Sequence, residues 1–165
     1  MIFVTIGTMY GFDRLIRKMD GIAGAIDEKV IMQIGDTSYK PKNAKYFTFA
    51  SKKDMDKLYN DARVIVCHSG VGSIISSLEY NKPVIVVPRL KAYGEVIDDH
   101  QTEIAKELEE RGSIKVAYDL EKLGDILKNV NGEEHRSFNK KNELMSNLRN
   151  YLDELRVVGE KLWQQ

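Results

Sequence analysis

Two hydrophobic patterns alternate along the chain. Short apolar runs rich in β-branched residues predict strands, and because successive positions are apolar, they are typical of strands buried on both faces. Between these runs, apolar residues recur at intervals of three or four, which predicts amphipathic helices. The alternation favours an α/β fold, a Rossmann-like parallel sheet with helices on both faces. The predicted strands are residues 2–6, 30–34, 45–49, 64–67, 84–87 and 114–117, and the helical patterns centre on 12–19, 55–59, 74–79 and 104–108.

The last part of the chain has a different pattern. Residues 129–134 are typical of a loop, and beyond them Met145, Leu148, Leu152 and Leu155 follow a helical rhythm. We therefore expect a domain over residues 1–130 and an amphipathic C-terminal helix within 131–165. That helix either packs on its own domain or docks on a partner, and its narrow apolar seam also allows a homodimer when the partner is absent.

Composition excludes several classes of protein. The 165 residues carry 25 basic and 25 acidic side chains. A protein that binds nucleic acid by neutralising phosphates normally has a basic excess, so we expect no nucleic-acid partner. The single cysteine, Cys67, excludes an internal disulfide framework. No leader or membrane span is evident, so we expect a cytoplasmic protein that reaches the membrane only peripherally, through a partner.

Two predicted strands end in glycine-containing turns. Gly7 and Thr8 follow the first strand, where open α/β sheets bind ligands. After the strand at 64–67 comes the run His68, Ser69, Gly70, Val71, Gly72, Ser73, and then a helical pattern. The two glycines allow a ligand to approach the backbone closely, and a helix N-terminus attracts phosphate. This turn is neither a Walker loop nor a complete dinucleotide fingerprint, and a purely structural turn remains the alternative.

A third polar loop follows the strand at 84–87. It contains Arg89 and ends in Asp98, Asp99, His100 and Gln101, at the start of the next helix. Either aspartate could cap that helix, whereas the imidazole and amide could hydrogen-bond sugar hydroxyls. A metal site here is disfavoured, because adjacent residues diverge around a helical turn.

These motifs resemble the C-terminal domain of glycosyltransferase family 28. The resemblance rests on His-x-Gly-x-Gly-Ser, on Lys-Pro-Val-Ile-Val-Val-Pro-Arg, on Asp-Asp-His-Gln and on the opening Phe-Val-Thr-Ile-Gly-Thr, and it covers roughly residues 1–130. The chain is most similar to the small catalytic subunits of two-part transferases. One group of these acts on dolichol-linked oligosaccharide and another makes bacterial exopolysaccharide. The resemblance implies the C-terminal half of a GT-B enzyme, which binds a UDP-sugar as donor substrate.

The family also implies roles for individual residues. Its pattern places the uracil near residues 49–51. Many relatives carry an acidic ribose contact eight positions after the histidine, where this chain has Ser76, and Glu79 could substitute for it. By resemblance, His68, Gly72 and Ser73 would hold the diphosphate with Gly7 and Thr8 beside it, and Gln101 with His100 or Asp99 would hold the donor sugar. Further candidate contacts with the nucleotide-sugar are Ser69, Gly70, Val71, Glu79 and Arg89.

The chemistry implied is inverting transfer without a metal ion or other cofactor. His68 and the helix N-terminus would stabilise the departing UDP. A general base must deprotonate the acceptor, and by resemblance it belongs to a membrane-anchored subunit that also binds a lipid-linked saccharide. The alternative is a non-catalytic UDP-sugar-binding module with a regulatory or scaffold role, which the serine at position 76 motivates.

Overall fold

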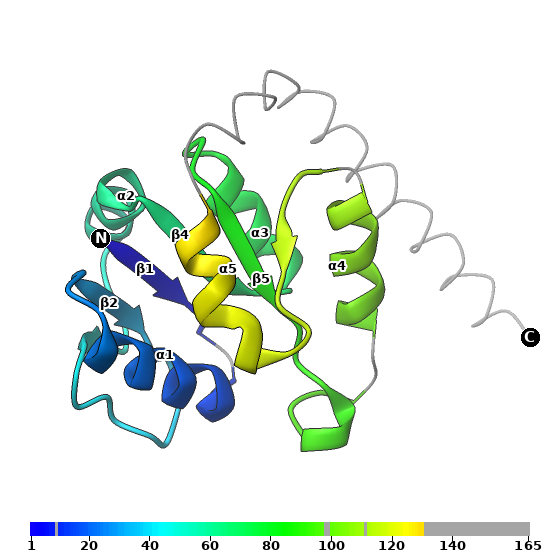
Figure 1. Cartoon of the computed structure of the whole chain (residues 1–165), viewed down its shortest axis with the longest axis horizontal. Coiled ribbons are helices and arrows are strands. Elements are labelled where there is room, and N and C mark those ends of the chain that lie inside the picture. The colour runs from blue at the N-terminus through cyan, green and yellow to red at the C-terminus, as the bar shows by residue number, and fades with distance from the viewer. Residues whose placement is uncertain (9, 98–99, 111, 131–165) are drawn as a thin grey trace, which may run out of the picture.

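Six parallel strands form one sheet in this computed structural model, which describes residues 1–8, 10–97, 100–110 and 112–130 (Figure 1). The strand order is β3-β2-β1-β4-β5-β6. The chain thus builds outward from β1 to one edge and then returns to start the other half at β4, beside β1. Open sheets bind ligands at the carboxyl ends of the strands where the order reverses, here β1 and β4. The strands are β1 (Ile2–Thr5), β2 (Val30–Gln33), β3 (Lys45–Phe47), β4 (Val64–His68), β5 (Val84–Val87) and β6 (Lys115–Val116).

Helices cover both faces of the sheet. Apolar residues of α1 and α5 pack on one face, and those of α2, α3 and α4 pack on the other. Short 3₁₀ turns η1 (Lys91–Tyr93) and η2 (Leu120–Lys122) interrupt two of the loops. The predicted α/β class with helices on both faces is confirmed. The helices are α1 (Asp13–Ala25), α2 (Lys52–Asp61), α3 (Val71–Leu78), α4 (His100–Glu110) and α5 (Leu123–Asn129).

Alternation along each central strand explains why apolar residues pack on both faces of the sheet. Val64 and Val66 of β4 join the cluster under α1 and α5, whereas Ile65 and Cys67 face the other helices. Every residue of β1, β4 and β5 is buried. These strands are buried on both faces, as predicted, and they form a rigid base for the loops at their carboxyl ends.

The structure differs from the expected elements mainly at the sheet edges. The strand expected at 45–49 ends at Phe47, because the chain then turns so that the Ser51 side chain can cap α2 by accepting from the Asp54 N–H. The strand expected at 114–117 pairs with β5 only at Lys115 and Val116. Helix α3 begins at Val71, ahead of the predicted start, and α5 was not predicted.

The expected C-terminal helix within 131–165, and most of the loop expected at 129–134, lie outside the described residues. Asn129 is the last residue of α5 and Val130 caps it. Within the described part of the chain, no helix combines the length and apolar character needed to cross a membrane.

Candidate functional site

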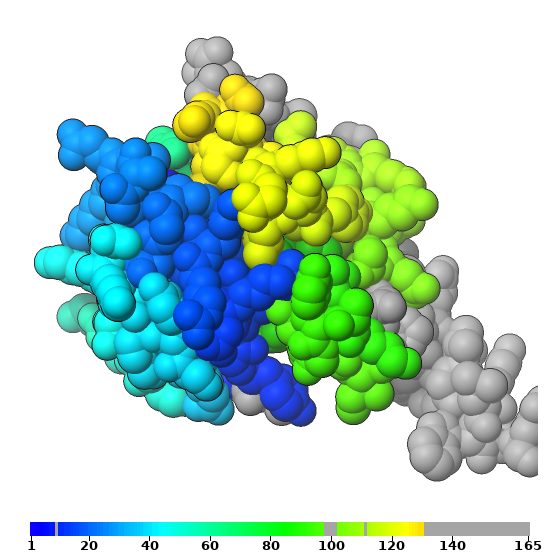
Figure 2. All heavy atoms as spheres, turned by 60° about the horizontal axis from the view of Figure 1, so that its bottom comes forward, coloured from blue at the N-terminus to red at the C-terminus, as the bar shows by residue number. Residues whose placement is uncertain are grey.

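The carboxyl ends of β1, β4 and β5 bring three predicted segments to one edge of the sheet. Thr5 pairs with Cys67 across β1 and β4, and His68 pairs with Val87 across β4 and β5. Neighbouring strands lie about 4.8 Å apart, so the loops that follow these residues are close together. Figure 2 turns this edge toward the viewer and shows the blue loop after β1 beside the green loop after β5.

Helix α3 presents an open N-terminus at this edge. Gly70 is its N-cap, and no side chain among the described residues caps it. The first-turn N–H groups of an α-helix have no partner within the helix. A Cβ atom added at Gly72 would meet nothing within 4 Å, so the space beside the turn is open. Backbone donors and the positive end of the helix dipole thus face a site that can hold an anion.

The His68 imidazole packs between two glycines. A Cβ atom at Gly7 would lie 3.0 Å from the ring Cε1, and one at Gly70 would lie 2.3 Å from Nε2. Gly7 also has a φ of +75°, a conformation that side chains disfavour. Both residues must therefore be glycine to accommodate the ring. The sequence suggested glycine here only for the approach of a ligand, and the packing of His68 is an additional reason that it did not reveal.

His68 is only 8% exposed. Burial, together with the nearby Arg89 guanidinium, lowers the pKa of its imidazole to about 4. The ring is therefore neutral at neutral pH, and its Nδ1 is buried without a hydrogen-bond partner among the described residues. A neutral imidazole can donate one N–H bond, and the Nε2 of His68 lies next to Gly70, at the turn before α3.

Arg89 lies inside the protein at the same edge. It is 4% exposed, and its Nη2 donates to the backbone carbonyls of Ile6 at 3.1 Å and Tyr10 at 2.9 Å. The guanidinium expected to contact the nucleotide-sugar thus holds the loop after β1 in place. Burial lowers its pKa, but arginine stays protonated, so Arg89 leaves a buried positive charge beside His68.

A second arginine makes the reciprocal connection. Arg14 of α1 forms a two-pronged ion pair with Glu95, with both N···O distances 2.8 Å. Its Nη2 also donates to the Pro88 carbonyl at 2.9 Å, and Glu95 accepts a further bond from the Leu90 N–H. Arg14 therefore anchors the loop after β5 to α1, while Arg89 anchors the loop after β1. Strand β4, which ends in His68, lies between β1 and β5, the two strands whose following loops these arginines hold.

The aromatic ring of Phe12 contacts both of these arginines. The Cζ of Arg14 is 5.3 Å from its centroid and the Cζ of Arg89 is 5.1 Å away. A cation this close to an aromatic ring is attracted to it electrostatically, so Phe12 helps to hold both guanidinium groups in place. The pairing of Arg14 with Glu95 was not predicted, since the two residues are 81 positions apart and each is unremarkable in its own segment.

Helix α3 separates the remaining predicted contacts along its length. Ser69 is fully buried just before the helix. Ser73 lies in the first turn, and its carbonyl accepts from the Ser77 hydroxyl at 2.7 Å. Ser76 is part-buried in the following turn. Glu79 caps the opposite end of α3, about 12 Å along the helix from Val71 at 1.5 Å per residue. The structure therefore does not bring Glu79 to the turn formed by residues 68–73, which we call the glycine turn.

The remaining predicted contacts are described only in part. Helix α4 begins at His100, so His100 and Gln101 lie in its first turn as expected, but their side chains are outside the description. Asp98 and Asp99 also fall outside the described residues. Thr8 is exposed beside Gly7.

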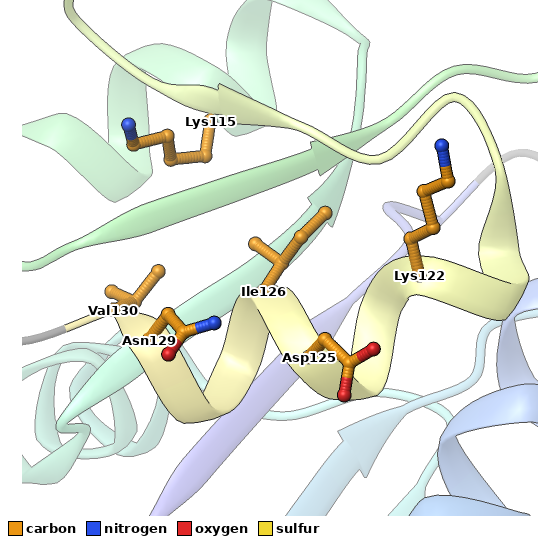
Figure 3. Close-up of a pocket in the computed structure, with 6 residues that line it drawn as sticks. All are labelled: Lys115, Lys122, Asp125, Ile126, Asn129 and Val130. Carbon is orange, nitrogen blue, oxygen red and sulfur yellow. The ribbon is translucent and has the colours of Figure 1, made fainter.

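Two hollows lie away from this edge. One, of about 470 Å³, lies beside α5, and Figure 3 shows Ile126 pointing from the helix toward β6 between Lys115 and Lys122. The other, of about 440 Å³, lies between α2 and the β2–β3 end of the sheet. It borders the region expected to hold uracil, since Phe49 and Ala50 line it.

Comparison with known proteins extends this picture. The sequence pattern of the family described as "Glycosyltransferase family 28 C-terminal domain" matches residues 1–155, further than the segment of about 130 residues expected. The human UDP-N-acetylglucosamine transferase subunit ALG13 is 32% identical over 124 residues, which cover 68% of this chain and 10% of that protein. This chain thus matches about a tenth of the length of that relative.

A bacterial relative is similar over a shorter segment. The UDP-N-acetylglucosamine--N-acetylmuramyl-(pentapeptide) pyrophosphoryl-undecaprenol N-acetylglucosamine transferase of Solibacter usitatus (strain Ellin6076) is 34% identical over 84 residues, 48% of this chain and 22% of that protein. Among solved structures, MurG of Acinetobacter baumannii has a TM-score of 0.58 at 18% identity, with 90% of this chain covering 49% of that one. This likeness confirms the predicted fold, equivalent to half of a GT-B glycosyltransferase.

Proposed function

The chain belongs to the family of the glycosyltransferase family 28 C-terminal domain, and on that premise we propose that it is the donor-binding subunit of a UDP-sugar glycosyltransferase. It would transfer GlcNAc or another hexose from a UDP-sugar to a lipid-linked saccharide. The observation that carries the proposal is the open N-terminus of α3, next to the buried His68 and Arg89 where β1 and β4 meet. That arrangement suits a diphosphate.

The names of two relatives support the choice of substrates. The human relative is a UDP-N-acetylglucosamine transferase subunit, which favours a UDP-sugar donor and a partner chain. The Solibacter relative uses a pyrophosphoryl-undecaprenol acceptor by its name, which favours a lipid-linked acceptor here. By the family pattern, Gln101 with His100 or Asp99 would hold the donor sugar.

The proposed reaction is a direct displacement that inverts the anomeric centre. The acceptor oxygen forms a bond to the anomeric carbon while the bond from that carbon to the diphosphate oxygen breaks, so UDP leaves with one more negative charge. Backbone N–H groups of Val71, Gly72 and Ser73 would stabilise that charge, with a hydrogen bond from neutral His68. Fixed donors of this kind contribute a few kcal/mol each to lowering the barrier, and no metal ion is needed in this proposal.

The acceptor must lose its proton to a base as the new bond forms. His68 is poorly suited to this role, because burial lowers the pKa of its imidazole to about 4 and its Nδ1 is enclosed. We assign the base and the acceptor-binding surface to a membrane-associated partner subunit. In this proposal the chain works at the cytoplasmic face of the membrane, and the segment at 131–165 is its docking element.

A non-catalytic UDP-sugar-binding module is the second candidate. It is favoured by Ser76 at the position where many relatives have an acidic residue, and by the placement of Glu79 at the far end of α3. Without a carboxylate, the ribose would be held less firmly, and the chain would serve a regulatory or scaffold role.

Calorimetric titration of the full chain with UDP, UDP-GlcNAc, UDP-glucose and UDP-glucuronate tests the donor site. We expect preference for one UDP-sugar, lost in Gln101→Ala while UDP itself still binds. Ser76→Glu should strengthen UDP binding if a ribose contact is missing, and Ser76→Ala is its control. Transfer assays with the partner then separate the candidates: UDP-sugar binding without transfer would favour the module, and no binding with the partner present would contradict both.

A further inference from the structure

Positive charge gathers at one edge of the molecule although the chain as a whole is neutral. Residues 37–53 contain five lysines and no aspartate or glutamate. They form the loop between β2 and β3, the edge strand β3 and the start of α2, drawn in cyan in Figures 1 and 2. All five lysines are exposed, and none forms an ion pair with any other described residue. We call this surface the basic edge, and its lysines are Lys40, Lys42, Lys45, Lys52 and Lys53.

Apolar surface lies within the same edge. Tyr46 is 44% exposed and Phe49 is 63% exposed. Phe49 borders the 440 Å³ hollow, which Phe47 and Leu58 also line. Two further lysines, Lys29 and Lys57, line this hollow, together with Asp54 and Asp61. The Asp54 carboxylate accepts a hydrogen bond from the Ser51 hydroxyl at 2.6 Å, and the Asp54 N–H donates to Ser51 Oγ at 3.2 Å, which holds Asp54 in the first turn of α2.

We propose that the basic edge binds directly to a bilayer of anionic phospholipids. Lysines near an anionic surface are attracted to its headgroups, and aromatic side chains favour the boundary between headgroup and hydrocarbon. A soluble polyanion would satisfy the lysines but would leave the exposed rings of Tyr46 and Phe49 in water. The combination of exposed lysines that form no ion pair with other described residues and exposed aromatic rings therefore favours a membrane as the occupant.

This contact would also orient the candidate donor site. Helix α2 begins with Lys52 and Lys53 at the carboxyl side of the parallel sheet, the same side as the glycine turn before α3. Docking through the basic edge would hold that side close to the lipid surface. The chain would then contribute its own membrane contact in addition to that of a partner subunit, and the contact does not depend on the donor being a UDP-sugar.

Vesicle flotation of the full chain tests the proposal. Vesicles of phosphatidylcholine are compared with vesicles in which about a third of the lipid is phosphatidylglycerol. We expect binding only to the anionic vesicles, with loss at high salt because the attraction is screened. Lys42→Gln with Lys45→Gln should lower the partition coefficient about 25-fold, roughly fivefold for each lysine. Tyr46→Ser should lower it severalfold with no change in charge.

The control removes the same charge from the opposite edge. Lys115→Gln with Lys122→Gln should leave the partition coefficient within about twofold, and UDP titration and thermal unfolding of each variant show that the fold is retained. Failure of the chain to bind anionic vesicles, or equal losses in the two double variants, would overturn the proposal. The proposal would also be overturned, in favour of a soluble acidic partner, by two results together: an unchanged partition coefficient for Tyr46→Ser, and displacement of the chain from anionic vesicles by a soluble polyanion.

Discussion

Two glycines in one turn are needed for different reasons, and their alanine variants should behave in opposite ways. In Gly70→Ala, the new methyl group would lie 2.3 Å from Nε2 and 2.9 Å from Cδ2 of His68, whereas ordinary contacts are 3.4–4 Å. The ring cannot retreat freely, because Gly7 already packs on it. The φ of −71° at Gly70 is open to alanine, so the cost is steric. Overpacking of this kind costs about 1–3 kcal/mol.

Gly72→Ala is the matched variant two positions away. Its Cβ atom would meet nothing within 4 Å, and alanine favours a helix over glycine by about 1 kcal/mol. The free energy of unfolding should therefore stay the same or rise. The methyl group would, however, occupy the space where the diphosphate is proposed to approach the backbone. We expect the affinity for UDP to fall tenfold or more, about 1.4 kcal/mol.

Urea unfolding measures the first quantity and calorimetric titration with UDP the second. A double-mutant cycle isolates the steric contact: in a His68→Ala background, Gly70→Ala should cost less than 1 kcal/mol, because the obstructing ring is gone. An undiminished cost in that background would refute the assignment of Gly70 to the imidazole. Normal UDP affinity in Gly72→Ala would refute the role of Gly72 at the ligand.

Three further predictions concern side chains around this edge. The pKa of His68 is about 4 in the folded chain and near 6.5 when unfolded, so between these pH values the unfolded state binds more protons than the folded state. The free energy of unfolding should therefore drop by up to about 3 kcal/mol as the pH falls through that window. Urea unfolding at several pH values measures the drop, which should be smaller in His68→Asn. Glu95→Gln removes one charge from the ion pair with Arg14 and should cost about 1–3 kcal/mol. Hydrogen exchange should rise in the loop after β5, which this pair anchors, and unchanged exchange there would contradict the anchoring role of the pair. Burial raises the pKa of the Cys67 thiol to about 12, so a thiol reagent should react with it only on unfolding, and rapid reaction in the native chain would show that this strand end opens.

The central strands were predictable because their signal is local. A strand that is apolar at successive positions, as at residues 64–67 of β4 and throughout β5, is typically buried on both faces. The edge strands β3 and β6 were placed less accurately, since each pairs on one side only and carries exposed polar residues such as Lys45 and Lys115. Helix α5 was missed because it has only seven residues and follows a 3₁₀ turn.

The glycine turn before α3 was also visible in the sequence, because glycine after a buried strand and before a helix is a local pattern. What remained hidden depends on contacts between distant segments. Arg89 looked like a ligand contact from its place in a polar loop, and only the fold reveals that it donates to the carbonyls of Ile6 and Tyr10. The neutral state of His68 likewise follows from burial between two loops, which no local pattern predicts.

An NMR titration of the ¹⁵N-labelled full chain with UDP shows whether a nucleoside diphosphate binds at the edge where β1 and β4 meet. We expect the largest saturable amide shifts at Val71, Gly72 and Ser73, with smaller ones at Gly7 and Thr8. Saturable shifts centred on the hollow beside α5, with none at the glycine turn, would contradict it.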